Sequence, residues 1–351
     1  MKIWFDADNG PHVLILRPLA EELQRRGHEI RFTARDRAST CELLDLYGLP
    51  YHRIGSEYGK GLLSKATGTL GRAAALVRTM RHWQADASFG HGSRALPLAS
   101  RLLGVPSVTM YDYEWVNPTV FSLACHSILL PAAITDARIR EVGLPLHKSF
   151  RYPGFKEELY LASSPLDDQA IQAVSQDLGL APDRVHVLLR PPATHAHYHN
   201  PEAERILAKL LQAIARRPDV QLIYLRRSED QMSMVQDLAP DRVIIPRRVY
   251  DGPSLIAAMD LVISGGGTMT REAAILGVPS YSFFRGRVGQ VDEALAAAGK
   301  LIMLRTPDEV AQRLTLKPRD SAVVAPDNSM LVSFISDHLL EAARSTADGG
   351  A

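Results

Sequence analysis

Short apolar runs that alternate with amphipathic segments are the feature that most constrains this sequence. KIWFDA at 2–7 reads as a strand, GPHVLILRPLAEELQRRGH at 10–28 as a helix that ends at Gly27, and EIRFTA at 29–34 as the next strand. Within that helix, apolar residues recur at three- and four-residue spacing, as they do on the buried face of an α-helix. Strands that alternate with helices predict a parallel sheet covered on both faces.

The alternation continues with a predicted helix over 70–84 and a predicted strand over 87–91, and it is interrupted once. Turn residues dominate 151–182, and a second series of strands and helices, with a helix over 231–238, begins with VHVLLRP at 185–191. We therefore predict two Rossmann-like, doubly wound α/β domains, a linker between them and a C-terminal helix. The predicted bounds are 1–160, 161–180, 181–328 and 329–345. Ligands of such sheets bind outside the carboxyl ends of the strands, so we expect these edges to face one another across a cleft.

Composition excludes several classes of protein. No stretch reaches the ~18 uncharged apolar residues that a membrane span needs. The N-terminus lacks the apolar core of a signal peptide, and two cysteines, Cys41 and Cys125, do not make a disulfide framework. We therefore expect a cytoplasmic protein with reduced thiols. A net charge of +1 argues against general binding of nucleic acid.

Three glycines stand between a strand and a helix in LVISGGGTMTREAAILGVPSYSF at 261–283. Glycine lets a ligand approach the backbone, and the unpaired N–H groups at a helix start attract a phosphate. Glu272 is expected in the first turn of the helix, where its carboxylate could accept hydrogen bonds from a ribose. The candidate phosphate ligands are Gly265, Gly266, Gly267, Thr268 and Thr270. The alternative is a tight structural turn in which Glu272 only favours the helix dipole, and the spacing is neither GxGxxG nor a P-loop.

A second polar turn, DADNGPH at 6–12, follows the first strand. An imidazole such as that of His12 has a pKa of ~6.5 and can take a proton from an acceptor hydroxyl. Asp6 and Asp8 are alternative bases. The competing interpretation is that all three only hold the turn and open the helix.

Other strand ends carry polar residues as well. Arg190 could clamp a diphosphate, since a guanidinium binds phosphate with two parallel hydrogen bonds. The run of His195, His197 and His199 follows it. Alternate residues of an extended strand stand ~6.6 Å apart, whereas zinc needs ligand nitrogens within ~2.1 Å. We therefore predict no metal site there, but a mobile loop that reaches into the cleft.

The first domain offers two further groups of candidates. His91, Ser93 and Arg94 follow a strand and are candidates for binding an acceptor. In MYDYEWVNP at 110–118, the paired carboxylates of Asp112 and Glu114 could act as acid and base. The alternative for this second group is a well-anchored loop.

The segment 58–83 contains five basic residues and no acidic residue, with leucines between them. A basic amphipathic helix can lie on an anionic membrane or on a lipid-linked substrate. The alternative is a solvated helix that packs its apolar side on the sheet.

Taken together, these features resemble the GT-B superfamily of nucleotide-sugar enzymes, and within it the DUF354 family. The resemblance rests on the turn Asn9-Gly10-Pro11-His12 and on the pattern Thr-x-x-x-Glu-x-x-x-x-Gly-x-Pro at 268–279. More distantly, the chain is similar to MurG-type N-acetylglucosaminyltransferases and to non-hydrolysing UDP-N-acetylglucosamine 2-epimerases.

The resemblance implies a metal-independent glycosyltransferase without a cofactor. Its substrates would be a nucleoside diphosphate sugar, UDP-linked, and a hydroxyl acceptor in surface polysaccharide, glycolipid or related glycan synthesis. The alternatives are a UDP-sugar 2-epimerase and a non-catalytic nucleotide-sugar-binding protein. For the donor, it implies Glu272 on the ribose, Val249 on the nucleobase and Gln290 near the sugar. His12, Asp8 and Glu114 are the implied catalytic residues.

Overall fold

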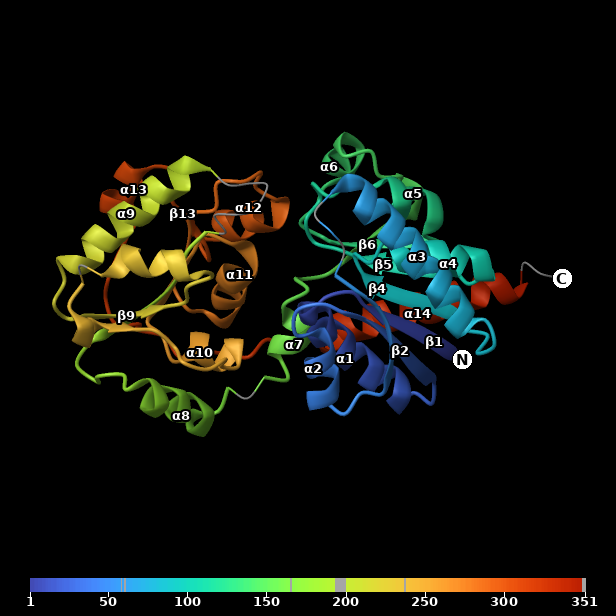
Figure 1. The fold of residues 1–351 in the computed structure, drawn as a ribbon, viewed down its shortest axis with the longest axis horizontal. Coiled ribbons are helices and arrows are strands. Elements are labelled where there is room, and N and C mark those ends of the chain that lie inside the picture. Colours follow the sequence, from blue (N-terminus) through green and yellow to red (C-terminus); the bar gives the residue numbers. More distant parts are fainter. Residues whose placement is uncertain (58, 60, 165, 193–199, 237, 349–351) are drawn as a thin grey trace. The chain divides into compact units, whose positions relative to one another are not determined.

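The computed structural model describes the chain except for residues 58, 60, 165, 193–199, 237 and 349–351. It forms two compact units, one of Met1–Tyr160 with the C-terminal segment from Asp327, the other of Leu161–Pro326. Each unit contains one sheet whose described strands all pair in parallel (Figure 1). The prediction of two doubly wound α/β arrangements is therefore confirmed.

The first unit has a seven-stranded sheet of order β3-β2-β1-β4-β5-β6-β7. The strands are β1 (Lys2–Ala7), β2 (Glu29–Asp36), β3 (Tyr51–Ser56), β4 (Ala87–His91), β5 (Ser107–Met110), β6 (Ser127–Pro131) and β7 (Ser149–Tyr152). The strand order changes direction between β1 and β4. Right-handed crossovers then leave these two strands toward opposite faces, so a crevice opens at their carboxyl ends.

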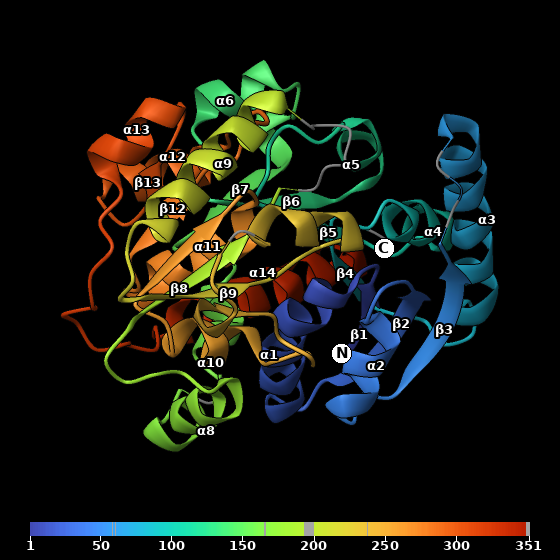
Figure 2. The same ribbon diagram turned by 60° about the vertical axis from the view of Figure 1, so that its left-hand side comes forward.

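Helices cover both faces of this sheet (Figure 2). They are α1 (Gly10–Arg25), α2 (Thr40–Leu46), α3 (Leu62–Met80), α4 (Ala95–Leu103), α5 (Thr119–Ala124), α6 (Asp136–Glu141), α7 (Glu158–Leu161) and α14 (Ser329–Asp348). Helix α1 contacts α2 and α14 on one face, and α4 contacts α3 and α5 on the other. Helix α14 is tied to the unit by the Arg26–Asp337 ion pair at 2.5 Å and by a 2.8 Å bond between Ser127 Oγ and His338 Nε2.

The second unit has a six-stranded sheet of order β10-β9-β8-β11-β12-β13. The strands are β8 (Val185–Arg190), β9 (Val220–Tyr224), β10 (Val243–Ile244), β11 (Leu261–Ser264), β12 (Ser280–Ser282) and β13 (Ile302–Met303). The helices are α8 (Asp168–Leu178), α9 (Pro201–Ala215), α10 (Gly252–Ala257), α11 (Gly267–Leu276), α12 (Gln290–Ala297) and α13 (Pro307–Arg313). The order changes direction between β8 and β11, which gives this unit a crevice of the same kind.

Three elements differ from the sequence prediction. Helix α3 begins at Leu62, not at residue 70, and the segment predicted as a linker contains α8. The α-helix predicted over 231–238 is a 3-10 helix, η2 (Glu229–Val235). Tertiary hydrogen bonds compete there, since the Gln231 side chain bonds to the Pro192 carbonyl and the Gln231 carbonyl accepts from Tyr224 Oη. Among the described helices, none combines the length and the apolar character that a membrane span requires.

Candidate functional site

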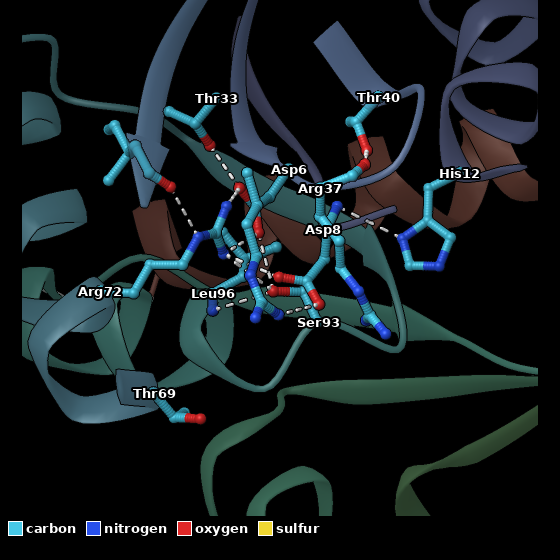
Figure 3. Close-up of polar contacts among 12 residues, drawn as sticks. Asp6, Asp8, His12, Thr33, Arg37, Thr40, Thr69, Arg72, Ser93 and Leu96 are labelled. Atoms are coloured by element: carbon cyan, nitrogen blue, oxygen red, sulfur yellow. Dashed lines mark hydrogen bonds and ion pairs between the residues drawn. The ribbon is translucent and has the colours of Figure 1, made fainter. Parts of the chain in front are cut away.

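A buried ion pair anchors the carboxyl end of β1 (Figure 3). The fully buried Asp6 carboxylate accepts two hydrogen bonds from the Arg72 guanidinium of α3, at 2.7 and 2.8 Å. The hydroxyls of Thr33, on β2, and Ser93, after β4, donate to the same carboxylate at 2.6 and 2.7 Å. One side chain thereby joins the ends of β1, β2 and β4 to a helix. This bonding favours a structural role for Asp6, which positions the turn, over the alternative role of a base.

Asp8 lies beyond this pair, at the mouth of the crevice. One Asp8 carboxylate oxygen is 3.4 Å from Arg35, the other is 3.4 Å from Arg72, and the side chain keeps 19% exposure. Burial raises the pKa of the Asp8 carboxyl above its usual value, although the charge of Arg72 opposes the shift. A carboxylate whose pKa is raised is a stronger base, so Asp8 is suited to accept a proton.

His12 lies in the first turn of α1. Burial, with a smaller effect from His91, lowers its pKa well below the usual value, so the imidazole is neutral at pH 7. The backbone N–H of Asp8 donates to His12 Nδ1 at 3.3 Å, which places the proton of the neutral ring on Nε2. Figure 3 shows this second nitrogen turned away from Asp8. His12 is therefore prepared to donate a hydrogen bond from Nε2 to an oxygen of a ligand.

A second set of charged groups stands beside His12. The ring of His91, the last residue of β4, has its centroid 4.9 Å from that of His12. His91 Nε2 lies 3.4 Å from one oxygen of Asp112, and Lys156 Nζ lies 3.3 Å from the other. Lys156 Nζ also donates to Glu157 at 2.8 Å. Burial disfavours an isolated charge, and here the two carboxylates and the ammonium group between them compensate one another.

These residues surround a cavity of about 300 Å³ in the first unit. Its volume lies at the lower end of the range of small-molecule pockets, roughly 300–1,000 Å³. The lining residues are Asp8, Asn9, His12, Arg37, His91, Gly92, Arg94, Tyr111, Asp112, Tyr113, Val116 and Phe121. The cavity thus brings together two of the three predicted catalytic residues and most of the predicted acceptor-side candidates.

Glu114 is placed differently. Its side chain is fully buried, and Arg138 Nη1 donates to it at 3.2 Å. The guanidinium of Arg138 in turn stacks 4.4 Å above the ring of Trp115. Glu114 is absent from the lining of the cavity, so its catalytic role stays a prediction, and its ion pair fits the alternative of an anchored loop.

Sequence reasoning did not place Arg72 or Lys156 at this site. Arg72 shares a helix face with Leu76 and Met80, at intervals of four residues, and this face is buried. A lone arginine on an apolar face signals a buried carboxylate partner, because a charge is not left alone in a core. No comparable pattern marks Lys156, which follows the turn Pro153-Gly154.

In the second unit, the glycine turn lies at the crevice between β8 and β11. Ser264 pairs with Arg190, and the Gly265 N–H donates to the Arg190 carbonyl at 3.0 Å. A Cβ on Gly265 would lie 2.8 Å from backbone atoms of Pro192, so this position requires glycine. The residues 265–267 are not among the glycines with positive φ. None of the three is therefore needed for a left-handed turn, and close approach of another group is the reason for glycine only at Gly265.

Helix α11 begins at Gly267, and its first N–H groups have no partner within the helix. Thr268 is exposed, whereas the hydroxyl of the buried Thr270 donates to the Gly267 carbonyl at 2.8 Å. Glu272 lies in the second turn of the helix, not in the first as expected from the sequence. Burial lowers the pKa of Arg190, and the charge of Glu272 opposes this shift. A cation, a carboxylate and a helix start thus meet at one crevice.

The remaining predicted donor residues lie on neighbouring segments. Val249 is 98% exposed in the loop before α10. Gln290 is the first residue of α12, which is joined to α11 by a 2.6 Å bond from Arg271 Nε to Asp292. His195, His197 and His199 lie outside the described residues. Among the residues that are described, no group of three His, Cys, Asp or Glu side chains is arranged to hold a metal ion.

The basic segment at 58–83 divides into two parts along α3. Toward the C-terminus of the helix, Leu76 and Met80 are buried against the sheet. Near its start, Leu63 and Leu70 are 79% and 61% exposed, and Lys65 between them is exposed as well. The packing alternative therefore holds for the later turns of α3 and not for its first turns.

Comparison with known proteins gives matches over nearly the whole chain. A family model described as "Protein of unknown function (DUF354)" matches residues 1–339. An uncharacterized protein of Methanocaldococcus jannaschii is 26% identical over 310 residues, which are 86% of this chain and 87% of the relative.

Two solved structures are similar in fold. The UDP-GlcNAc 2-epimerase of Neisseria meningitidis, bound to UDP-GlcNAc, has a TM-score of 0.74 at 15% identity, over 97% of this chain and 100% of the other. MurG of Acinetobacter baumannii has a TM-score of 0.57 at 16% identity, over 97% and 99% of the two chains. These similarities establish a GT-B-like fold.

Proposed function

The chain belongs to the DUF354 family, and from this membership and its GT-B-like fold we propose that it is a metal-independent glycosyltransferase. It moves a sugar from a nucleoside diphosphate sugar, UDP-linked, to a hydroxyl group of an acceptor. The observation that carries the proposal is the pair of crevices: each unit has its own switch point, and each is lined by different chemistry. One holds cationic groups suited to a diphosphate, the other a cavity with proton-handling groups.

The donor occupies the crevice of the second unit in this proposal. Arg190 and the N–H groups at the start of α11 bind the diphosphate, and Glu272 binds the ribose. Val249 and Gln290 contact the nucleobase and the sugar. The structure of the Neisseria epimerase with UDP-GlcNAc supports this choice of ligand, because that protein has the same fold.

The acceptor occupies the cavity of the first unit. His12 Nε2–H donates to the acceptor oxygen, and the Asp8 carboxylate takes the proton of the hydroxyl group. The acceptor oxygen then bonds to the anomeric carbon as the bond from that carbon to the diphosphate breaks. The diphosphate leaves with the bonding electrons, and fixed positive groups near Arg190 stabilise its charge.

A UDP-sugar 2-epimerase is the second candidate. The observation that favours it is the buried group of Asp112, Lys156 and Glu157 beside the cavity, because epimerisation needs carboxylates and no acceptor. The closer fold similarity to the Neisseria epimerase than to MurG points the same way.

Ligand binding tests the donor assignment first. We expect at least one of UDP, GDP, TDP and their sugars to raise the melting temperature, since a ligand at 100 times its Kd stabilises the native state by ~2.7 kcal/mol. If none does, the nucleotide-sugar proposal is wrong. Product analysis then separates the two enzymes: an epimerase converts UDP-sugar alone to an isomer, whereas a transferase without acceptor releases UDP slowly at most.

Substitutions at the cavity test whether the protein is catalytic. His12→Ala and Asp8→Asn are expected to abolish most turnover while nucleotide binding is retained, because both residues lie in the first unit. Glu114→Gln tests the third predicted catalytic residue in the same assay. Turnover that survives all three substitutions would show that these residues are not the catalytic ones. A wild-type chain that binds the sugar nucleotide but shows neither transfer nor epimerisation would instead be a nucleotide-sugar-binding protein.

We also propose that the first turns of α3 contact an anionic membrane surface or a lipid-linked acceptor. The exposed Leu63 and Leu70 supply apolar area, and Lys65 supplies positive charge. Apolar burial and attraction to anionic lipids add in such contacts.

A further inference from the structure

The loop after β9 passes the glycine turn of the second unit. Strand β9 ends at Tyr224, next to β8, and Arg227 follows three residues later. Arg227 Nη2 lies 3.0 Å from the position that a Cβ on Gly266 would take. The guanidinium group therefore lies directly against the backbone of Gly266, one residue before α11 begins.

Three hydrogen bonds fix this loop. Arg227 Nε donates to the Pro191 carbonyl at 2.9 Å, and the Arg227 backbone N–H donates to Gln231 Oε1 at 2.8 Å. The side-chain amide of Gln231 also donates to the Pro192 carbonyl at 3.0 Å. Gln231 is fully buried, so its amide is held in one orientation. It fastens the loop after β9 to the segment after β8, and Arg227 is thereby oriented toward the glycines.

The absence of a side chain at Gly266 has a consequence for this arginine. A Cβ at 3.0 Å from Nη2 would crowd the guanidinium and require it to shift by a few tenths of an ångström, whereas glycine leaves it in place. Guanidinium groups present their N–H donors in a planar fork that matches two phosphate oxygens. Arg190 ends the neighbouring strand β8, so one arginine from the end of β8 and one from the loop after β9 stand near the same helix start. A diphosphate, with its several negative charges, is the ligand chemistry that this arrangement matches.

We propose that Arg227 binds the diphosphate of the donor together with Arg190, and that Gln231 is the positioning residue that holds Arg227 in place. This inference rests on the proposed function, because it assigns a further ligand to the same donor site. Glycine at position 266 suits this arrangement, because a Cβ there would crowd the arginine.

The test measures the binding of UDP and of uridine by calorimetry with the full chain. Arg227→Ala is expected to weaken UDP binding by ~10–100-fold, or about 1.4–2.8 kcal/mol, while uridine binding changes less than about twofold. Arg227→Lys keeps the charge but loses the fork, so we expect an intermediate loss. Arg226→Ala, at the exposed neighbouring position, is the matched control and should change neither affinity by more than about twofold.

The role of Gln231 is tested by a double-mutant cycle. Gln231→Ala alone should weaken UDP binding and leave uridine binding unchanged. In the Arg227→Ala background it should add less than about twofold, because its effect acts through the arginine. If the double variant instead loses UDP affinity by the product of the two single losses, Gln231 does not act through Arg227 and the positioning role is wrong.

The outcomes separate this inference from the function on which it rests. If the wild-type chain binds UDP and Arg227→Ala binds it equally well, the role of Arg227 is wrong while the donor site stands. If Arg227→Ala weakens UDP and uridine alike, its effect is structural and the inference is again wrong. If the wild-type chain binds neither UDP nor GDP nor TDP, the proposed function itself fails.

Discussion

Removal of the buried Asp6 carboxylate at the end of β1 should lower the stability of the first unit more than removal of an exposed carboxylate does. Asp6→Asn removes the carboxylate that accepts two hydrogen bonds from the buried Arg72 guanidinium, and leaves near it the longer contact with one Asp8 oxygen at 3.4 Å. The two side chains are 0% and 1% exposed, so water does not replace the lost carboxylate. Loss of one partner of a buried pair costs ~3–5 kcal/mol. The side-chain amide of asparagine also presents an N–H donor to groups that donate to Asp6 in the wild-type chain, so at least one of these hydrogen bonds is lost.

Tryptophan fluorescence measures this effect selectively. The chain has three tryptophans, Trp4, Trp83 and Trp115, and all belong to the first unit. The indole of Trp4 donates at 2.8 Å to Thr33, whose hydroxyl in turn donates to Asp6, so one probe is part of the network. For a unit of this size, 1 kcal/mol corresponds to ~2–4 °C in melting temperature. The expected decrease is therefore roughly 6–20 °C in the tryptophan-detected transition.

A double-mutant cycle with Arg72→Met decides whether the pair is the cause. We expect the variant with both substitutions to be more stable than the sum of the two losses predicts, by at least ~2 kcal/mol, since it leaves no charge uncompensated. Asp36→Asn removes a carboxylate from the exposed pair with Arg53 and should cost ~1 kcal/mol or less. A loss below ~1 kcal/mol for Asp6→Asn, or losses that simply add, would refute the reasoning.

Three further predictions concern other parts of the chain. Because the pKa of native His12 is lowered below its usual 6.5, the stability it contributes is complete above that pH and is lost as the pH falls toward the native pKa, at up to ~1.4 kcal/mol per unit. His12→Gln should flatten this part of the tryptophan-detected pH profile, and an unchanged slope would contradict the buried neutral imidazole. Gly265→Ala should destabilise the second unit by ~1–3 kcal/mol, because its Cβ meets proline backbone at 2.8 Å, whereas Gly267→Ala, with its nearest contact at 3.6 Å, should be tolerated. Circular dichroism follows both units, and the part of its transition that tryptophan fluorescence does not report belongs to the second unit. Equal losses for the two variants would show that space is not the reason. Leu63→Ser with Leu70→Ser should reduce sedimentation with vesicles that contain anionic phosphatidylglycerol, and binding equal to that of wild type would exclude contact through α3.

The sequence alone determined the succession of elements. Hydrophobic periodicity depends on residues that are neighbours along the chain, so the strands at 2–7, 87–91 and 185–190 and the helices that follow them could be predicted closely. Local chemistry also marked the two turns that open at the crevices, through the aspartates before His12 and the glycines before Thr268. Where tertiary hydrogen bonds compete with local preference, as they do at Gln231, the predicted helix type was wrong.

Only the tertiary structure decided which of these turns meet and which charges they face. Arg72 and Asp6 are 66 residues apart, and they pair because the strand order puts β4 beside β1 and α3 over their ends. Sequence spacing likewise gives no sign that Arg227 lies against Gly266 or that Lys156 lies beside Asp112. Periodicity states which face of an element is buried, but the partner of a buried charge depends on how the elements are arranged in space. For this reason the sequence indicated the kind of ligand and most of the side chains proposed to bind it, and the structure alone added Arg227.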